Sequence, residues 1–215
     1  MDFSNRRIID GHVHYPHFSF DEDLMSIMEA AGVEKMAVVC TPDEKRLSLV
    51  PDAMHLKAQF PEKVYVFGGL DISPLFMAPD EAGEAFAHYV DVLQEMGADG
   101  IKMIEGKAMM RKQLPIPDFD DPVYAPYWEK MGETHTPLIF HVNDPEEFWD
   151  PDRIPDWARN MGWFYGDGTY INNEDQYRQV LNVLDRHPDL NVTFAHFFFI
   201  SAQLDRLGEY LERYP

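Results

Sequence analysis

Short runs rich in β-branched and aromatic residues alternate along this chain with amphipathic helical patterns. The runs expected to form strands are 7–14, 35–42, 64–73, 100–106, 137–144 and 191–198. Between them, at 21–32, 81–98 and 173–188, apolar residues recur every three or four positions, which indicates helices. Alternation of strands and helices is typical of a parallel sheet with helices packed outside it. The sequence therefore predicts an α/β fold of six strand–helix units, the last helix being 201–215.

The end of the chain repeats a signal seen twice before. In "AQFPEKVYV" and "DRHPDLNVTF" a helix runs into a residue followed by proline and then into a strand, and the last residues, "ERYP", show the same signal. No linker or low-complexity segment interrupts the series of units. We therefore expect a single domain, 1–215, that is incomplete at its carboxyl end, with a further strand after Pro215.

Charge, hydropathy and cysteine content indicate which partners and which cellular setting suit this chain. The 18 basic and 38 acidic side chains give a formal net charge of −20, which repels phosphate backbones and anionic membrane surfaces. The residues after the two N-terminal arginines do not form the apolar core of a signal peptide, and the longest apolar run is far below the roughly 20 residues that span a bilayer. Cys40 is the single cysteine, which favours a cytoplasmic setting. Because it follows "MAVV", we interpret it as a buried residue rather than a reactive thiol.

Four histidines stand at the ends of predicted strands. His12 and His14 close the first strand, and strand alternation puts both imidazoles on one face within about 7 Å of rise. His141 and His196 come late in the fifth and sixth strands. The carboxyl ends of parallel strands lie at one edge of a sheet, where ligands bind. The remaining histidines do not end strands: they are His17, His55, His88, His135 and His187. This placement predicts a metal site.

These motifs carry a family resemblance that spans nearly the whole chain. "DGHVH" at the end of the first strand is followed, in order, by a histidine ending strand five and another ending strand six. "GADGIKM", "DDPVYAPYWEKMGETHTPLIFHV" and "VLNVLDRHPDLNVTFAH" support the likeness. The chain resembles the amidohydrolase superfamily, and within it the amidohydrolase-related branch that includes the aminocarboxymuconate-semialdehyde and resorcylate-type decarboxylases.

The resemblance implies a TIM-like (βα)8 barrel, of which this chain supplies six units, with strands seven and eight missing. It also implies one divalent metal ion, usually zinc, with manganese or iron as alternatives. His12, His14 and His141 would be metal ligands. His196 would be either a further ligand or a hydrogen-bond partner of the metal-bound water, and it is the candidate for the acid–base group. The family takes an aspartate from the end of strand eight, which this sequence lacks.

Other residues are candidates for binding a substrate. Lys102 could pair with a substrate carboxylate, or equally be a lysine that is paired inside the mouth of the barrel or points at solvent. Glu105 and Asp71 fall near strand ends, where either could be an ordinary loop residue. The long segment from Pro145 to Asn172 contains Trp149 and Trp163 and is expected to be a lid over the site rather than simple packing.

The sequence favours an enzyme that acts on a small organic substrate, an amide, ester, lactone or carboxylic acid, through a metal-bound water. Non-oxidative decarboxylation by the same branch is the alternative chemistry. A hypothesis of another class is a non-catalytic metal-binding or interaction remnant without the strand-eight aspartate. Because six strands cannot close an eight-stranded barrel, we expect bare edges at the first and sixth strands. The chain alone would then aggregate, pair these edges in a homo-oligomer, or need the missing segment.

Overall fold

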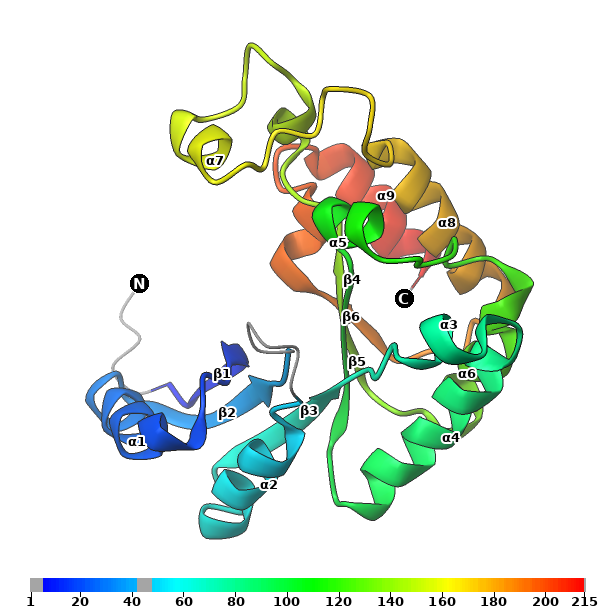
Figure 1. Ribbon diagram of the computed structural model, residues 1–215. Coiled ribbons are helices and arrows are strands. Elements are labelled where there is room, and N and C mark those ends of the chain that lie inside the picture. Colours follow the sequence, from blue (N-terminus) through cyan, green and yellow to red (C-terminus); the bar gives the residue numbers. More distant parts are fainter. Residues whose placement is uncertain (1–5, 42–47, 215) are drawn as a thin grey trace. The chain divides into compact units, whose positions relative to one another are not determined.

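A computed structural model describes residues 6–41 and 48–214 of the chain, and its elements are labelled in Figure 1. Within this part, six parallel strands form one sheet in the order β1-β2-β3-β4-β5-β6. The strands are β1 (Ile8–His14), β2 (Val33–Val39), β3 (Val64–Gly69), β4 (Gly100–Gly106), β5 (Leu138–Val142) and β6 (Val192–Phe194). Sequential parallel strands joined by helices are the arrangement of a TIM-like barrel, so the predicted fold class is confirmed.

The helices of the described residues connect these strands. They are α1 (Asp21–Ala30), α2 (Val50–Gln59), α3 (Pro74–Met77), α4 (Ala82–Glu95), α5 (Ala108–Gln113), α6 (Ala125–Thr134), α7 (Asp156–Asn160), α8 (Asn173–Arg186) and α9 (Leu204–Arg213). Short 3-10 turns lie at η1 (Phe18–Phe20), η2 (Pro79–Glu81), η3 (Pro122–Tyr124), η4 (Glu146–Trp149) and η5 (Ala195–Phe199). The patterns at 21–32, 81–98, 173–188 and 201–215 thus correspond to α1, α4, α8 and α9.

The chain divides into two compact units, and the chain passes between them after β3, inside α4 and inside β4. The first unit comprises Met1–Asp71 and Tyr89–Lys102, and the second comprises Ile72–His88 and Met103–Pro215. That residues 1–215 form a single domain remains a prediction.

The first unit is organised around the buried strand β2. Met36, Val38 and Val39 are buried there, because β2 has a parallel partner on each side. Asp99 links β3 to α2. Its carboxylate accepts a hydrogen bond from the backbone nitrogen of Val66 at 2.7 Å and forms an ion pair with Lys57 at 2.6 Å. β1 pairs with β2 alone among the described strands, and its Ile8 and Ile9 side chains are 40% and 57% exposed.

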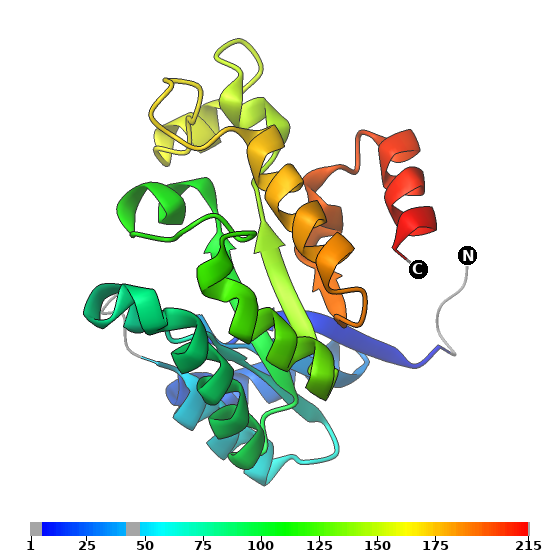
Figure 2. The same cartoon turned by 90° about the vertical axis from the view of Figure 1, so that its right-hand side faces the viewer.

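The second unit has an aromatic core packed on β5, all five residues of which are buried. Figure 2 shows α6 and α8 on the same face of β5. The aromatic side chains of this core, whose rings contact one another, are Phe86, Phe119, Tyr124, Tyr127, Trp128 and Phe140. β4 and β5 approach so closely at Gly106 that a Cβ atom on this residue would overlap the carbonyl oxygen of His141. Glycine is therefore required at this position.

The sixth strand is shorter than predicted. We expected a strand over 191–198, but β6 ends at Phe194 and the chain enters the turn η5. His196, Phe197, Phe198 and Phe199 all have positive φ, between 53° and 58°. Left-handed backbone cannot continue a strand, so the prediction that His196 lies within β6 is wrong. The expected ends of the second and third strands are also too long, because β2 stops at Val39 and β3 at Gly69.

Candidate functional site

His12 and His14 lie at the carboxyl end of β1 in the first unit. The register with β2 steps from Asp10 opposite Met36 to Val13 opposite Val38, so β1 carries one extra residue there. The Asp10 carboxylate accepts a hydrogen bond from the backbone of His12 at 3.1 Å and supports this bulge. The two imidazole rings are stacked with centroids 5.1 Å apart. The structure thus brings His12 and His14 together, as the sequence predicts.

Lys102 is buried and lies beside the first histidine pair. Its side-chain nitrogen is 3.4 Å from Nε2 of His12, within the same unit. A lysine nitrogen and an imidazole nitrogen at this distance can share a hydrogen bond, and the tautomer of His12 sets which of the two donates. This agrees with the alternative in which Lys102 is paired inside the protein, and its role toward a substrate stays a prediction.

His141 and His196 form a second pair, in the second unit. His141 is a buried residue of β5, and its ring centroid is 5.3 Å from that of His196 in the η5 turn. The ring of Phe199 lies 5.2 Å from His141 and 5.0 Å from His196. His196 was expected to reach the end of β5 from a longer sixth strand. The left-handed turn after β6 places it there instead.

A sharp corner follows β5 and was not anticipated from the sequence. Asn143 has φ 69°, a left-handed conformation that asparagine tolerates better than most residues. Its side chain donates to the carbonyl of Asn173 at 3.1 Å and accepts from the amide of Gln176 at 2.7 Å, which anchors the corner to α8. Its backbone nitrogen donates to the carbonyl of Gly106 at 2.9 Å.

The corner returns the next residue, Asp144, toward the histidine of the strand. Oδ1 of Asp144 lies 3.7 Å from Nε2 of His141, and both side chains are buried. The strand predicted over 137–144 includes Asp144 as its last residue, whereas β5 ends at Val142 and Asp144 lies beyond it. The signal that was available is the step "HVND", in which asparagine and aspartate, both turn-forming residues, follow a strand histidine directly.

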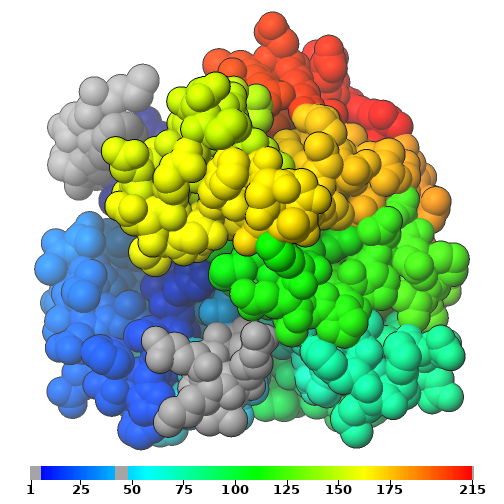
Figure 3. Space-filling model, turned by 45° about the horizontal axis from the view of Figure 1, so that its top comes forward, coloured from blue at the N-terminus to red at the C-terminus, as the bar shows by residue number. Residues whose placement is uncertain are grey.

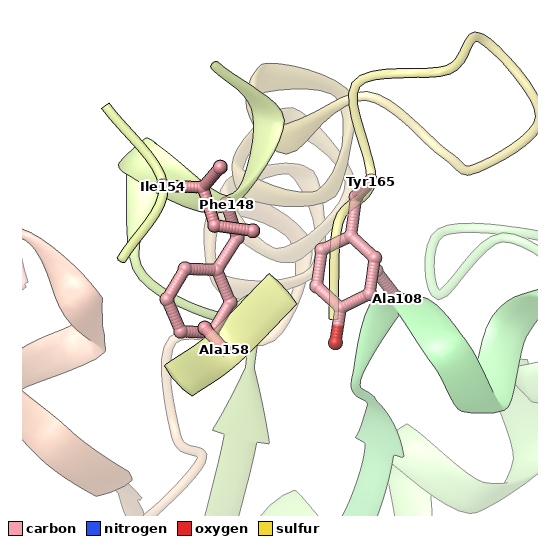
Figure 4. Close-up of a cluster of buried hydrophobic side chains, with 5 residues drawn as sticks. All are labelled: Ala108, Phe148, Ile154, Ala158 and Tyr165. Atoms are coloured by element: carbon pink, nitrogen blue, oxygen red, sulfur yellow. The ribbon is translucent and has the colours of Figure 1, made fainter. Parts of the chain in front are cut away.

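The aromatic segment 145–172 has a small apolar core of its own. Figure 4 shows Phe148, Ile154, Ala158 and Tyr165 of the segment together with Ala108 of α5, all buried. In Figure 3 the segment, in yellow, forms a continuous layer of surface next to the green atoms of α5. These contacts show how the segment packs, and its action as a lid stays a prediction.

The two tryptophans predicted to bind substrate take part in this packing. The indole nitrogen of Trp149 donates to the carbonyl of Ile171 at 3.0 Å, and its ring lies 4.9 Å from that of Tyr165. The ammonium of Lys107 lies 5.1 Å from the centre of the Trp163 ring. Both side chains are partly buried. They can therefore stabilise the segment whether or not they also touch a substrate.

The remaining acidic candidates, Glu105 and Asp71, belong to different units. Glu105 is buried on β4 in the second unit, where its negative charge, after burial itself, raises the pKa of Tyr124 and Tyr127. Asp71 follows β3 in the first unit, and its charge adds to burial in raising the pKa of Tyr89. Neither contact resembles a metal centre.

Within residues 6–41 and 48–214, no three histidine, cysteine, aspartate or glutamate side chains gather closely enough to hold a metal ion. The candidate ligands occur instead as pairs, one in each unit. In the same part of the chain, no helix is both long enough and apolar enough to cross a membrane.

Cys40 gives a prediction that is simple to check. Burial, followed by the charge of Asp52, raises the pKa of this thiol to about 12, so it stays protonated near neutral pH. Because the thiolate is the reactive form, we expect the native protein at pH 8 to react with iodoacetamide at least about 100-fold more slowly than the urea-unfolded protein. Mass spectrometry of the alkylated chain measures both rates. Equal rates would show that Cys40 is accessible and ionised in the fold.

No known family model matches the chain, and no curated protein sequence does. Solved structures match it in fold. An uncharacterised TIM-barrel protein from Bordetella bronchiseptica is 14% identical with a TM-score of 0.65, over 97% of this chain and 73% of that one. A Staphylococcus aureus protein assigned as an amidohydrolase is 15% identical with a TM-score of 0.59, over 95% and 72%.

A third similar structure is 5-carboxyvanillate decarboxylase from Novosphingobium aromaticivorans, solved with manganese. It is 13% identical with a TM-score of 0.60, over 99% of this chain and 72% of that one. Other structures of this fold are a 2,6-dihydroxybenzoate decarboxylase and a 4-oxalomesaconate hydratase. The neighbours are thus largely amidohydrolase-type enzymes with different reactions, in agreement with the resemblance seen in the sequence. At these identities the likeness establishes the fold alone.

Proposed function

We propose that this chain belongs to the amidohydrolase superfamily and acts as a metal-dependent hydrolase on a small organic substrate, an amide, ester, lactone or carboxylic acid. The observation that carries the proposal is the pairing of imidazoles at the carboxyl ends of parallel strands. His12 and His14 stack at 5.1 Å at the end of β1, and His141 on β5 lies 5.3 Å from His196 in the turn after β6. Several histidines at the carboxyl ends of strands of one fold are typical of catalytic metal sites on barrels.

His12, His14 and His141 would hold one divalent ion. Imidazole nitrogens bind zinc, and they also accept manganese or iron, so the donor chemistry of the chain fits such an ion. A ring separation of 5.1 Å in the first pair is compatible with two nitrogens that each bind at about 2.0–2.1 Å. Zinc is the ion we favour, and when bound it would supply Lewis acidity toward a substrate carbonyl.

The chain's own residues would handle the proton and the substrate. His196 is exposed beside His141, and an imidazole can take a proton from an attacking water and return it to the leaving group near neutral pH. Lys102, Trp149 and Trp163 are the candidates to bind the substrate, Lys102 through a carboxylate and the tryptophans through apolar groups. The exposed Ile8 and Ile9 on the edge strand β1 support self-association into a homo-oligomer. A cytoplasmic location is part of the same proposal.

The metal content of purified protein tests the proposal. We expect about one zinc, manganese or iron ion per chain in the wild type, and a loss of at least about tenfold in the double variant His12→Ala, His14→Ala, because two ligands are removed. The matched control is His55→Ala, His88→Ala, which removes two exposed histidines on α2 and α4 and is expected to keep the ion. Inductively coupled plasma mass spectrometry measures all three. Equal metal content in both variants would exclude the site.

Decarboxylation is the second candidate reaction. Solved neighbours of this fold include two decarboxylases of small aromatic acids, which supports a carboxylic acid as substrate. Metal-loaded protein incubated with a panel of hydroxybenzoates, lactones and amides separates the two chemistries. Release of carbon dioxide indicates decarboxylation, and opening of a lactone or amide indicates hydrolysis.

A further inference from the structure

We propose that Asp144, oriented by Tyr165, is a positioning residue for His141: it keeps the proton on Nε2 and leaves Nδ1 as the nitrogen that faces a metal ion. The metal part of this inference rests on the proposed function, in which His141 is a ligand. The arrangement of Asp144 and Tyr165 does not depend on that assignment, because all three side chains lie in the second unit.

The geometry around His141 selects one ring nitrogen. Nε2 faces Oδ1 of Asp144 at 3.7 Å, an ion-pair distance that is longer than a hydrogen bond. Such contacts near an active site often shorten when the ligand binds. A histidine that binds a metal through one nitrogen usually donates the other N–H to a carboxylate, which fixes the tautomer and the orientation of the ring. Asp144 is placed to be that carboxylate.

Tyr165 fixes the second oxygen of the same carboxylate. Its hydroxyl donates to Oδ2 of Asp144 at 3.1 Å, in a buried hydrogen bond. The backbone nitrogen of Tyr165 donates to the carbonyl of Phe148 at 2.8 Å, and its ring belongs to the small core of the aromatic segment. Burial and the neighbouring carboxylate raise the pKa of Tyr165, so the hydroxyl remains a donor at neutral pH.

The two contacts together engage both oxygens of Asp144. One oxygen accepts from Tyr165 and the other faces His141, which suits a residue that orients an imidazole better than one that binds the ion itself. The aromatic segment thereby gains a role beyond packing, because it carries the hydroxyl that holds Asp144 in place. Substitutions in the segment should alter the ring of His141 without touching it.

The tautomer of His141 tests the positioning role without any metal. In metal-free, ¹⁵N-labelled protein at a pH where imidazoles are neutral, long-range ¹H–¹⁵N spectra report which nitrogen carries the proton, and His141→Gln identifies the signals. We expect Nε2–H in the wild type and a loss of this preference in Asp144→Ala. Asp144→Asn, which keeps the shape and an acceptor oxygen, should retain it in part. Protonation at Nδ1 in the wild type, or an unchanged tautomer in Asp144→Ala, would overturn the inference.

Metal affinity supplies the second readout. Competition with a chelator for Zn²⁺ should show affinity about 10–100-fold weaker in Asp144→Ala and a smaller loss in Tyr165→Phe. The matched control is Tyr170→Phe, in the same segment, whose ring contacts that of Tyr165 at 4.7 Å; it should bind as the wild type does. Equal losses in the two tyrosine variants would show an effect of packing alone and count against the inference. If the wild type binds no metal, the proposed function fails, whereas the tautomer still decides the role of Asp144.

Discussion

Gly106→Ala is expected to lower the free energy of unfolding by about 3 kcal/mol, since the added methyl group meets backbone rather than a movable side chain. A Cβ at this position would overlap the carbonyl oxygen of His141 and press on the α-carbon of Val142. β4 and β5 would have to separate locally, at the point where β5 presents His141. Urea denaturation followed by circular dichroism measures the loss.

A second glycine provides a control of opposite sign. Gly208 lies inside α9, and a Cβ there would meet nothing within 4 Å. Gly208→Ala should therefore stabilise the protein by roughly 0.5–1 kcal/mol through the better helix propensity of alanine. If Gly106→Ala were as stable as the wild type, the close approach of β4 to β5 would not exist in solution.

The order of the elements could be predicted from the sequence because it depends on local patterns. Apolar periodicity in α4 and α8 and the β-branched run of β4 are visible without any tertiary information. The end of β6 could not be predicted, because "AHFFF" has the composition of a strand. Its turn is left-handed at four consecutive residues, which no local preference favours for phenylalanine. Packing within the second unit, where the Phe198 ring stacks on Phe194 and the Tyr177 hydroxyl donates to the Phe198 carbonyl, must compensate for that backbone.

The part of the candidate site that lies at the carboxyl ends of strands could be predicted from the sequence. Alternation along β1 placed His12 and His14 together, and the position of His141 at the end of β5 follows from the same rule. The pairing of Asp144 with Tyr165 could not be predicted, because it joins residues 21 positions apart after the corner at Asn143. A hydrogen bond of that kind depends on the backbone path of the segment, which composition does not encode. Trp149 and Trp163 are candidates because they lie in the long aromatic segment, and both pack against the small apolar core of that segment.

Asn143→Ala is expected to destabilise the protein by about 3 kcal/mol. The asparagine side chain makes two buried hydrogen bonds to α8, so its removal leaves the Gln176 amide and the Asn173 carbonyl without these partners. A lost partner of a buried polar group costs about 1–3 kcal/mol. Alanine also adopts the left-handed backbone at 143 less readily than asparagine, at a further cost of about 1 kcal/mol. Urea denaturation compares the variant with the wild type.

Asn143→Gly separates these two causes, because glycine accepts positive φ without penalty but cannot bond to α8. It should lose about 2 kcal/mol and so fall between the wild type and Asn143→Ala. Asn191→Ala, at an exposed asparagine before β6, is the matched control and should change stability by less than about 0.5 kcal/mol. If the glycine variant were as unstable as the alanine variant, the backbone at 143 would not be left-handed, and Asp144 would lose the corner that turns it toward His141.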